Sequence, residues 1–284
     1  MRLRLVTVRR IAGVLTALAV AVGCVAGCGG GADSSGRAGR TPDSRPAPQA
    51  ARMVATGNTM DQSLPAAAAS TPLTDQDGRH LTLGSLRGKV VVLAPLLTMC
   101  QETCPMTSEN FHQAAQAALA AQAAKRSGSP GKVVFVELTV DPARDTVRRM
   151  HAYAKLYGAL PNWLLVTGKP AQVTAMWKAL GVTTEKVPTE EPVRDWLSGQ
   201  KVEHPYDVHH QDVVVIVGQD GHLRWITVGR PDARGTRLPT SMQKFLDDEG
   251  RDNLAHPAAG GASSWTARDV EQAVAYVRGL DSDG

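Results

Sequence analysis

The feature that most constrains this 284-residue chain is a pair of cysteines four positions apart, Cys100 and Cys104, in the segment TMCQETCP. On one helical turn, with a rise of about 1.5 Å per residue, their Cα atoms would lie roughly 6 Å apart. That separation permits a disulfide. It also lets both sulfurs reach one soft metal ion, because thiolates favour Cu(I), zinc or iron-sulfur clusters over magnesium or calcium. The spacing alone does not choose between these chemistries.

The residues around the cysteines predict a strand, a loop and then a helix. Pro105 suits the first turn of a helix and disfavours helical backbone at the preceding residue, so we expect Cys104 at the N-cap of a helix over 106–124. The positive end of the helix dipole would then lower the pKa of the Cys104 thiol. The continuous apolar run 90–97 is typical of a strand buried on both faces. This order of elements is the thioredoxin-like arrangement.

Further strand-like and helical segments alternate along the chain. We expect strands over 132–140, 163–167, 212–217 and 223–228, and helices over 146–157, 170–180, 241–248 and 266–280. The alternation predicts an α/β fold, with a central mixed sheet and helices on both of its faces. Asp141 is expected in the turn after the second core strand, and Asp145 or Thr146 at the cap of the next helix.

Two other regions complete the expected domain. Asp77-Gly78 indicates the turn of an N-terminal β-hairpin over 72–83, which precedes the core strands. The region 183–207 has few apolar residues in any period, so we expect an insertion or loop near the cysteines.

The first 27 residues have the features of a bacterial secretory signal. Four arginines precede an apolar run, 11–22, that is too short to span a membrane. The tetrapeptide VAGC, ending at Cys28, matches a lipobox, in which the cysteine becomes the lipid-bearing first residue; Cys24 is the weaker candidate. We therefore expect a signal peptide over 1–27, lipidation at Cys28, and a mature protein on the extracytoplasmic face of the cell membrane.

The remaining chain divides into a tether and one domain. The segment 28–70 is rich in Gly, Ala, Ser and Pro, as flexible linkers are, and 71–284 is long enough for a single domain with its own core. Removal of the four N-terminal arginines would lower the formal net charge from +4 to zero. That balance gives no support to nucleic-acid binding. Only Cys100 and Cys104 remain in the domain, so no disulfide framework is expected.

Taken together, five segments of 72–280 resemble the SCO (synthesis of cytochrome c oxidase) family of thioredoxin-like copper proteins. Besides C-x-x-x-C-P, the resemblance rests on LTDQDGRHLTLGSLRGKVVVL, VDPARDT, WLLVTG and YDVHHQDVVVIVGQDG. It implies copper bound by the two cysteines and by a histidine that lies just before a strand ending in a D-G turn. Alignment on Asp220-Gly221 places that histidine at His210. His209 stands where the family usually has an aspartate, which could orient the imidazole or tune copper release.

The resemblance implies a membrane-anchored metallochaperone that helps to assemble the CuA centre of cytochrome c oxidase. Copper would be the cofactor, and the copper-centre subunit of the oxidase the partner, with other copper or thiol donors as further partners. The alternative is a thiol-disulfide oxidoreductase that reduces the cysteines of the target, with Cys100 and Cys104 as its catalytic pair. A redox or copper sensor is a third possibility, so the sequence leaves open whether the chain is an enzyme.

Two further side chains near the motif could assist copper binding. His204 precedes a proline and could swing toward the site, although a solvated loop histidine is the commoner case. Met99 could offer a thioether to Cu(I), although methionine is more often a packing residue.

Overall fold

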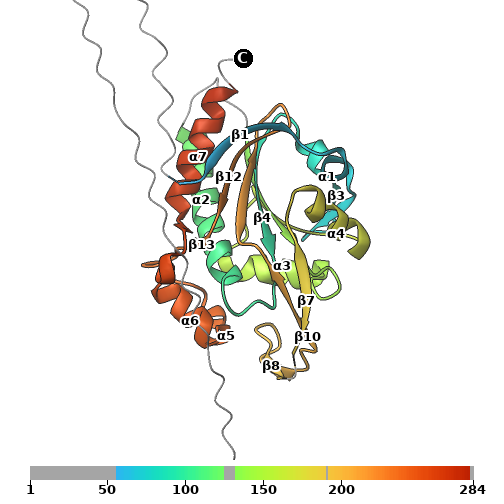
Figure 1. The fold of residues 1–284 in the computed structure, drawn as a ribbon, viewed down its shortest axis with the longest axis vertical. Coiled ribbons are helices and arrows are strands. Elements are labelled where there is room, and N and C mark those ends of the chain that lie inside the picture. The colour runs from blue at the N-terminus through green and yellow to red at the C-terminus, as the bar shows by residue number, and fades with distance from the viewer. Residues whose placement is uncertain (1–55, 125–131, 190, 282–284) are drawn as a thin grey trace, which may run out of the picture. The chain divides into compact units, whose positions relative to one another are not determined.

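Within the residues that this computed structural model describes, 56–124, 132–189 and 191–281, the centre of the fold is an eight-stranded mixed sheet (Figure 1). The strands lie in the order β1 (Asn58–Ser63), β12 (His222–Val228), β11 (Val213–Val217), β4 (Val90–Leu96), β5 (Val133–Thr139), β6 (Trp163–Thr167), β2 (Leu73–Asp75) and β3 (His80–Leu81). β4, β5 and β6 are parallel, whereas β11 is antiparallel to both β4 and β12.

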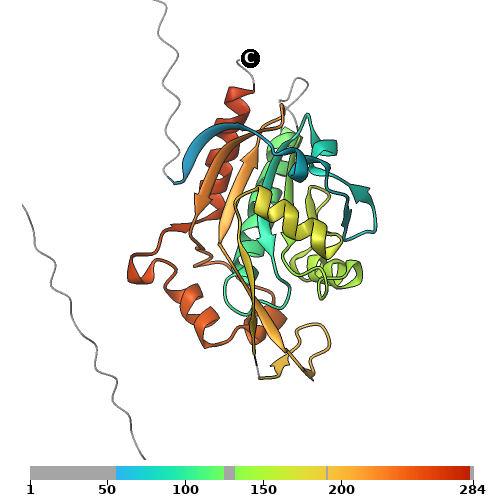
Figure 2. The same cartoon turned by 45° about the vertical axis from the view of Figure 1, so that its right-hand side comes forward.

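Helices cover both faces of this sheet. They are α1 (Ala66–Ser70), α2 (Cys104–Ala124), α3 (Val147–Tyr157), α4 (Pro170–Ala179), α5 (Thr240–Phe245), α6 (Asp248–Ala255) and α7 (Ala267–Leu280), with short 3-10 turns at η1 (Leu83–Leu86) and η2 (Ala259–Gly261). α2 and α7 lie together on one face, and α1 and α4 lie on the other (Figures 1 and 2). The unit β4-α2-β5 is followed by β11-β12-α7, which gives the thioredoxin-like topology. The α/β prediction is confirmed.

The central strands follow from their composition. Every residue of β4 (VVVLAPL) and of β5 (VVFVELT) is buried, as expected of parallel strands covered on both faces. The predicted hairpin also forms, with Leu73 opposite Leu81 and Gly78 in the turn at a φ of 79°. At the other end of the chain, Thr266 begins α7 with a reciprocal capping box to Asp269.

The expected tether extends too far toward the domain. Residues 58–63 form β1, which pairs with the edge of β12, and α1 follows it. β1 is polar and almost wholly exposed, so it has no apolar period for a sequence pattern to reveal. The folded part therefore begins near Asn58 rather than at residue 71. Cys24, Cys28 and the expected signal peptide lie outside the described residues.

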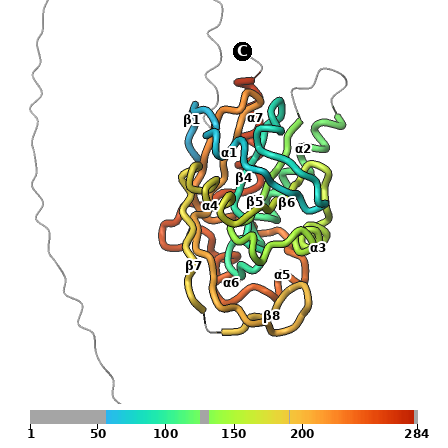
Figure 3. Tube along the Cα trace, turned by 90° about the vertical axis from the view of Figure 1, so that its right-hand side faces the viewer, coloured from blue at the N-terminus to red at the C-terminus, as the bar shows by residue number. Residues whose placement is uncertain are grey.

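The expected loop over 183–207 is wrong in detail, because this region and the residues after it form two hairpins. β7 (Thr184–Pro188) pairs with β10 (Tyr206–His210), and β8 (Val193–Arg194) pairs with β9 (Lys201–Val202). Figures 1 and 3 place both hairpins at the same end of the domain as α5 and α6.

The segment before α7 also differs from the prediction. The expected helix over 241–248 is two helices, because Asp247 interrupts it and caps α6 by accepting the Gly250 N–H. A short parallel pair, β13 (Arg230–Pro231) and β14 (Ser264–Trp265), closes the segment. None of the helices in the described part of the chain has the length and apolarity needed to span a bilayer.

Candidate functional site

The cysteines lie at the carboxyl end of β4, where the chain turns into α2. Both are free thiols, and they are 8% and 1% exposed. The Cys104 N–H donates to Cys100 Sγ at 3.5 Å. The carbonyl of Thr103 accepts the N–H groups of Met106 and Thr107, so Cys104 is the first residue of the helix rather than its cap. Both cysteines are therefore buried side chains, just before and at the start of α2.

His210 is the last residue of β10 and faces Cys104. Its Nε2 lies 3.8 Å from Cys104 Sγ, and its Nδ1 lies 3.1 Å from the carbonyl oxygen of Gln211. Because a carbonyl only accepts hydrogen bonds, Nδ1 carries a proton, and in the neutral ring Nε2 would present its lone pair to the sulfur. His209 is exposed, and its strand partner is Glu185. The structure thus brings His210, and not His209, to the cysteines.

The surroundings of Cys104 raise the pKa of its thiol well above the ordinary value. The hydrogen bond with Cys100 is the largest cause, followed by burial and by the nearby Cys100 and Asp212. The sequence-based expectation of a lowered pKa is therefore wrong for this state. The position of Cys104 at the helix N-terminus does not lower its pKa enough to offset the effects of the neighbouring thiol and of burial. The pKa shift therefore favours the neutral thiol of Cys104 in this state.

A carboxylate that the sequence analysis missed lies beside these groups. Asp212 accepts a hydrogen bond from Thr103 Oγ1 at 3.1 Å. Burial raises the pKa of Asp212, and the nearby His210 opposes that rise. The available signal was the spacing of two between His210 and Asp212, which puts both residues on one face of an extended chain. The site therefore keeps a carboxylate near the imidazole although His209 replaces the aspartate usual in the family.

The two auxiliary candidates have other surroundings. Met99 is buried, and its sulfur accepts a hydrogen bond from Arg149 Nη2 at 2.7 Å. His204 is also buried, and its Nε2 has no hydrogen-bond partner. Burial and the charge of Arg144 lower the pKa of His204, whereas Asp207 and Asp141 oppose that change. The polar groups near Met99 and His204 are thus arginines and aspartates rather than the two cysteines.

The donor set is adjacent but not gathered around one point. Among the described residues, no three His, Cys, Asp or Glu side chains form a ready metal cluster. Cys104 contacts Cys100 through its backbone N–H and His210 through its sulfur, so two sulfurs and one nitrogen are the candidate donors. Two thiolates and a neutral imidazole suit a soft monovalent ion. The residues present therefore fit copper chemically.

Acidic residues surround the loop between the cysteines. Burial, followed by the charges of Glu249, Asp207 and Asp247, raises the pKa of Glu102 to about 7, and His209 opposes the rise. We call Glu102, Asp207, Asp247 and Glu249 the acidic rim; its negative charge favours the approach of cations to the site.

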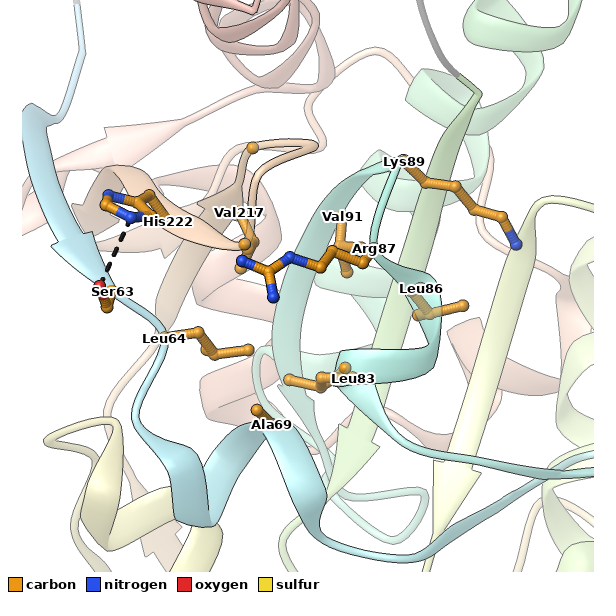
Figure 4. Close-up of a pocket in the computed structure, with 13 residues that line it drawn as sticks. Ser63, Leu64, Ala69, Leu83, Leu86, Arg87, Lys89, Val91, Val217 and His222 are labelled. Atoms are coloured by element: carbon orange, nitrogen blue, oxygen red, sulfur yellow. Dashed lines mark hydrogen bonds between the residues drawn. The ribbon is translucent and has the colours of Figure 1, made fainter.

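A separate pocket of about 130 Å³ lies at the opposite end of β4 (Figure 4). Its walls include Leu64, Leu83 and Val91, with Arg87 across its centre. The Arg87 guanidinium already donates two hydrogen bonds to the carbonyl of Asp220, at 3.0 and 2.6 Å. None of the candidate copper ligands lines this pocket.

Comparison with known proteins identifies the family of the chain. The SCO1/SenC family model matches residues 62–235. The chain belongs to the SCO1/SenC family. It is 29% identical over 152 residues to a protein of Stutzerimonas stutzeri that is named for copper binding, and 32% identical over 125 residues to the mitochondrial SCO1 homolog 1 of Arabidopsis thaliana. These matches cover 54% and 44% of this SCO1/SenC chain but only 64% and 34% of the relatives, so the chain spans less than two thirds of their length.

Solved structures of the Sco type are similar to this family member at low identity. Copper-bound ScoI of Bradyrhizobium japonicum has a TM-score of 0.43 and 22% identity, covering 68% of this chain and 100% of that chain. Copper-bound ScoI of Arabidopsis thaliana has a TM-score of 0.42 and 23% identity, covering 67% and 94%. The copper in these two structures describes those two proteins.

Proposed function

We propose that this SCO1/SenC chain is a copper metallochaperone that is anchored to the extracytoplasmic face of the membrane and serves assembly of the CuA centre of cytochrome c oxidase. Cys100 and Cys104 would supply thiolates and His210 a neutral imidazole. The observation that carries the proposal is the contact of His210 Nε2 with Cys104 Sγ at 3.8 Å, with the Nδ1 proton directed to a carbonyl. The Stutzerimonas stutzeri relative that is named for copper binding and the membership of the SCO1/SenC family support the same role.

The site chemistry favours copper cargo over structural zinc. Among the described residues, the adjacent sulfur and nitrogen donors are Cys100, Cys104 and His210, and the nearby Asp212 already accepts the Thr103 hydroxyl, whereas a structural zinc site nearly always takes four ligands. Each cysteine must lose a proton to become a ligand, and the raised pKa of Cys104 makes that proton a competitor of the metal. Apparent copper affinity should therefore increase as the pH rises. The oxidase subunit that receives the copper is the proposed partner, and other copper or thiol donors are further partners.

The oxidoreductase alternative receives less support from the same geometry. A dithiol that attacks disulfides works through its thiolate, and accessible cysteines of low pKa do so best. Here both cysteines are buried and the pKa of Cys104 is raised. Dithiol exchange also has no use for a third donor, whereas copper binding does.

Replacement of each histidine tests the ligand set. Reduced full-length protein with His210→Ala should lose one of three donors and bind Cu(I) at least tenfold more weakly in competition with a Cu(I) chelator. The matched variant His209→Ala, on the neighbouring and exposed position, should bind like the parent. Loss of copper in His209→Ala together with retention in His210→Ala would refute the assignment.

The same variant separates copper delivery from disulfide reduction. His210→Ala keeps both thiols, so a chaperone carrying it should fail to support oxidase assembly in cells at low copper while still exchanging disulfides with a model substrate. The exchange rate has to be measured on the same sample, because His210 contacts the Cys104 sulfur. Full assembly by a copper-free His210→Ala protein with normal exchange kinetics would favour the oxidoreductase.

A further inference from the structure

The motif VDPARDT has no role in the ligand set, yet its residues are hydrogen-bonded to the loop before Cys100 and to the strand that ends in His210. Residues 140–146 join β5 to α3, and Arg149 is the third residue of that helix. We call Asp141, Arg144, Asp145 and Arg149 the site bracket. The site bracket makes two sets of hydrogen bonds, which we call its arms. The cysteine arm reaches the loop before Cys100, and the histidine arm reaches the strand that ends in His210.

The first arm holds Thr98, two residues before Cys100. Asp145 is fully buried and accepts both the N–H of Thr98, at 3.2 Å, and the Thr98 hydroxyl. Its other oxygen accepts the Thr139 hydroxyl at 2.6 Å. Arg149 Nε donates to Thr98 Oγ1 at 2.8 Å. The loop is thus bonded to the bracket through both its backbone and its side chain.

The β8–β9 hairpin closes this arm from outside. Arg149 Nη2 lies 2.5 Å from Asp195 Oδ1, and its guanidinium lies 4.7 Å from the centre of the Trp196 ring. Trp196 Nε1 donates to the carbonyl of Thr98 at 2.6 Å. Asp195 and Trp196 are only 6% and 8% exposed, although they lie in a hairpin turn. Every polar group of Thr98 is therefore hydrogen-bonded, and the approach to Cys100 is fixed.

The second arm holds the strand that ends in His210. Arg144 pairs with the carboxylate of Asp141, and its Nη1 donates to the carbonyl of Tyr206 at 2.8 Å. The Tyr206 hydroxyl donates back to Asp141 at 3.2 Å, and the Arg144 guanidinium lies 4.2 Å from the centre of the Tyr206 ring. Tyr206 is the first residue of β10 and His210 is the last. Because an extended strand has a nearly fixed rise, about 3.3 Å per residue, anchoring its start also places its end.

We propose that the site bracket is a positioning device that sets the separation between the Cys100 thiol and the His210 imidazole. Arg144 is the positioning residue for His210, and Arg149 is the positioning residue for Cys100. The four residues of the site bracket lie within one short segment of chain. The geometry of that segment therefore sets the distance between Cys100 and His210, which are 110 residues apart in the sequence. This inference rests on the proposed copper function, and it assigns a role to side chains that contact neither the cysteines nor His210.

Double-mutant analysis tests the histidine arm. In the full-length protein, Arg144→Gln should weaken Cu(I) binding about tenfold, because the start of β10 is released. In a protein that already carries His210→Ala, the same substitution should have no further effect, since it acts only through that ligand. An equal loss of affinity in both backgrounds would show a general structural effect and overturn the histidine arm.

A copper-free measurement tests the cysteine arm. Arg149→Gln should change the equilibrium constant between the Cys100–Cys104 dithiol and its disulfide, in a thiol redox buffer, by at least threefold, whereas Arg144→Gln should leave it unchanged. If Arg149→Gln does not fold, Trp196→Phe removes the N–H donated to Thr98 and keeps an aromatic ring against Tyr153. A folded variant with the parental equilibrium constant would overturn this arm.

Arg224→Gln is the matched control, because Arg224 pairs with Asp61 and Asp220 away from the site. It should change neither copper affinity nor the dithiol equilibrium. A parent protein that binds no copper, or binds it independently of His210, would refute the proposed function instead, and the dithiol measurement would still decide the cysteine arm. Equal effects of all three arginine substitutions would overturn the bracket.

Discussion

Asp145 illustrates how a single side chain acquires a role that its neighbours in the sequence do not reveal. Asp145 and Thr146 are both suitable helix caps, and the sequence left the choice open. Thr146 caps α3 by accepting the Arg149 N–H, which leaves Asp145 free to bond Thr98. Burial raises the pKa of Asp145 to about 6, and its bonds to the Thr139 and Thr98 hydroxyls oppose the rise. That contact depends on how β4 and β5 pair, so no local pattern predicts it.

Glu137 is a second buried carboxyl, in the middle of β5. Its oxygens accept hydrogen bonds from Ser108 Oγ and Trp163 Nε1, each at 2.8 Å. Burial raises the pKa of Glu137 from 4.5 to about 8 despite these two bonds. The carboxyl is therefore mostly protonated in the folded protein at pH 7.

This pKa predicts how stability depends on pH. Between pH 4.5 and 8, the folded protein keeps a proton on Glu137 that the unfolded chain releases. The contribution of Glu137 to the free energy of unfolding is therefore fully present below pH 4.5 and is lost as the pH rises to 8, at about 1.4 kcal/mol per pH unit. Glu137→Gln mimics the neutral acid and should remove this slope.

Urea unfolding of parent and variant at pH 5 and pH 8 measures the difference. Relative to the parent, Glu137→Gln should gain roughly 3 kcal/mol between the two pH values, as an order of magnitude. Glu185→Gln, on the exposed strand β7, should keep the parental dependence. The same pH dependence in Glu137→Gln as in the parent would show that Glu137 is ionised in the folded protein.

At the scale of elements, the sequence predicted the buried strands and the capped helices but not the polar edges. β4, β5 and β6 are visible as apolar runs, and α7 has both an apolar face and a capping box. β1 pairs with the distant β12, and the hairpins β7–β10 and β8–β9 consist of short strands with few apolar residues, so none of them leaves a periodic signal. The same limit applies to the site. Cys100, Cys104 and His210 were accessible through motif and alignment, whereas Asp212 and the site bracket depend on tertiary contacts.

The start of the folded domain can be tested at Gly57, just before β1. Gly57 has a φ of 82°, and an added Cβ would lie 2.5 Å from the Trp225 ring and 2.7 Å from the Ile226 carbonyl oxygen. Gly57→Ala should therefore destabilise the protein by both backbone strain and a clash, about 2 kcal/mol or more in urea unfolding.

Gly78→Ala provides the matched control for this prediction. Gly78 has nearly the same φ, 79°, but an added Cβ there meets nothing within 4 Å. It should therefore show only the backbone cost, about 1 kcal/mol. A neutral Gly57→Ala variant would place residue 57 in the tether, as the sequence first suggested.

At the scale of the whole molecule, one domain presents its candidate copper ligands at the carboxyl end of the parallel strands. The ligands come from the β4–α2 loop, the start of α2 and the end of β10, so the site exists only when the sheet and the β7–β10 hairpin are both in place. The acidic rim around Glu102 lies at this same end. A membrane partner would have to approach this end of the domain, and the length of chain that precedes β1 therefore matters.

The last prediction concerns attachment of the domain to the membrane through Cys28. About 27 residues separate Cys28 from Thr56, and a chain of that length spans at most ~100 Å when fully extended. A lipid on Cys28 would therefore keep the copper site close to the membrane surface, where an oxidase subunit could meet it. Cys28→Ala should abolish incorporation of a labelled lipid and move the protein out of the membrane fraction. Its copper affinity should not change, because the ligands lie in the folded domain. Cys24→Ala is the control, with normal lipid labelling expected. Continued lipid labelling of Cys28→Ala would show that Cys28 is not the lipid anchor. Loss of labelling in Cys24→Ala alone would assign the anchor to Cys24 and lengthen the chain between lipid and domain.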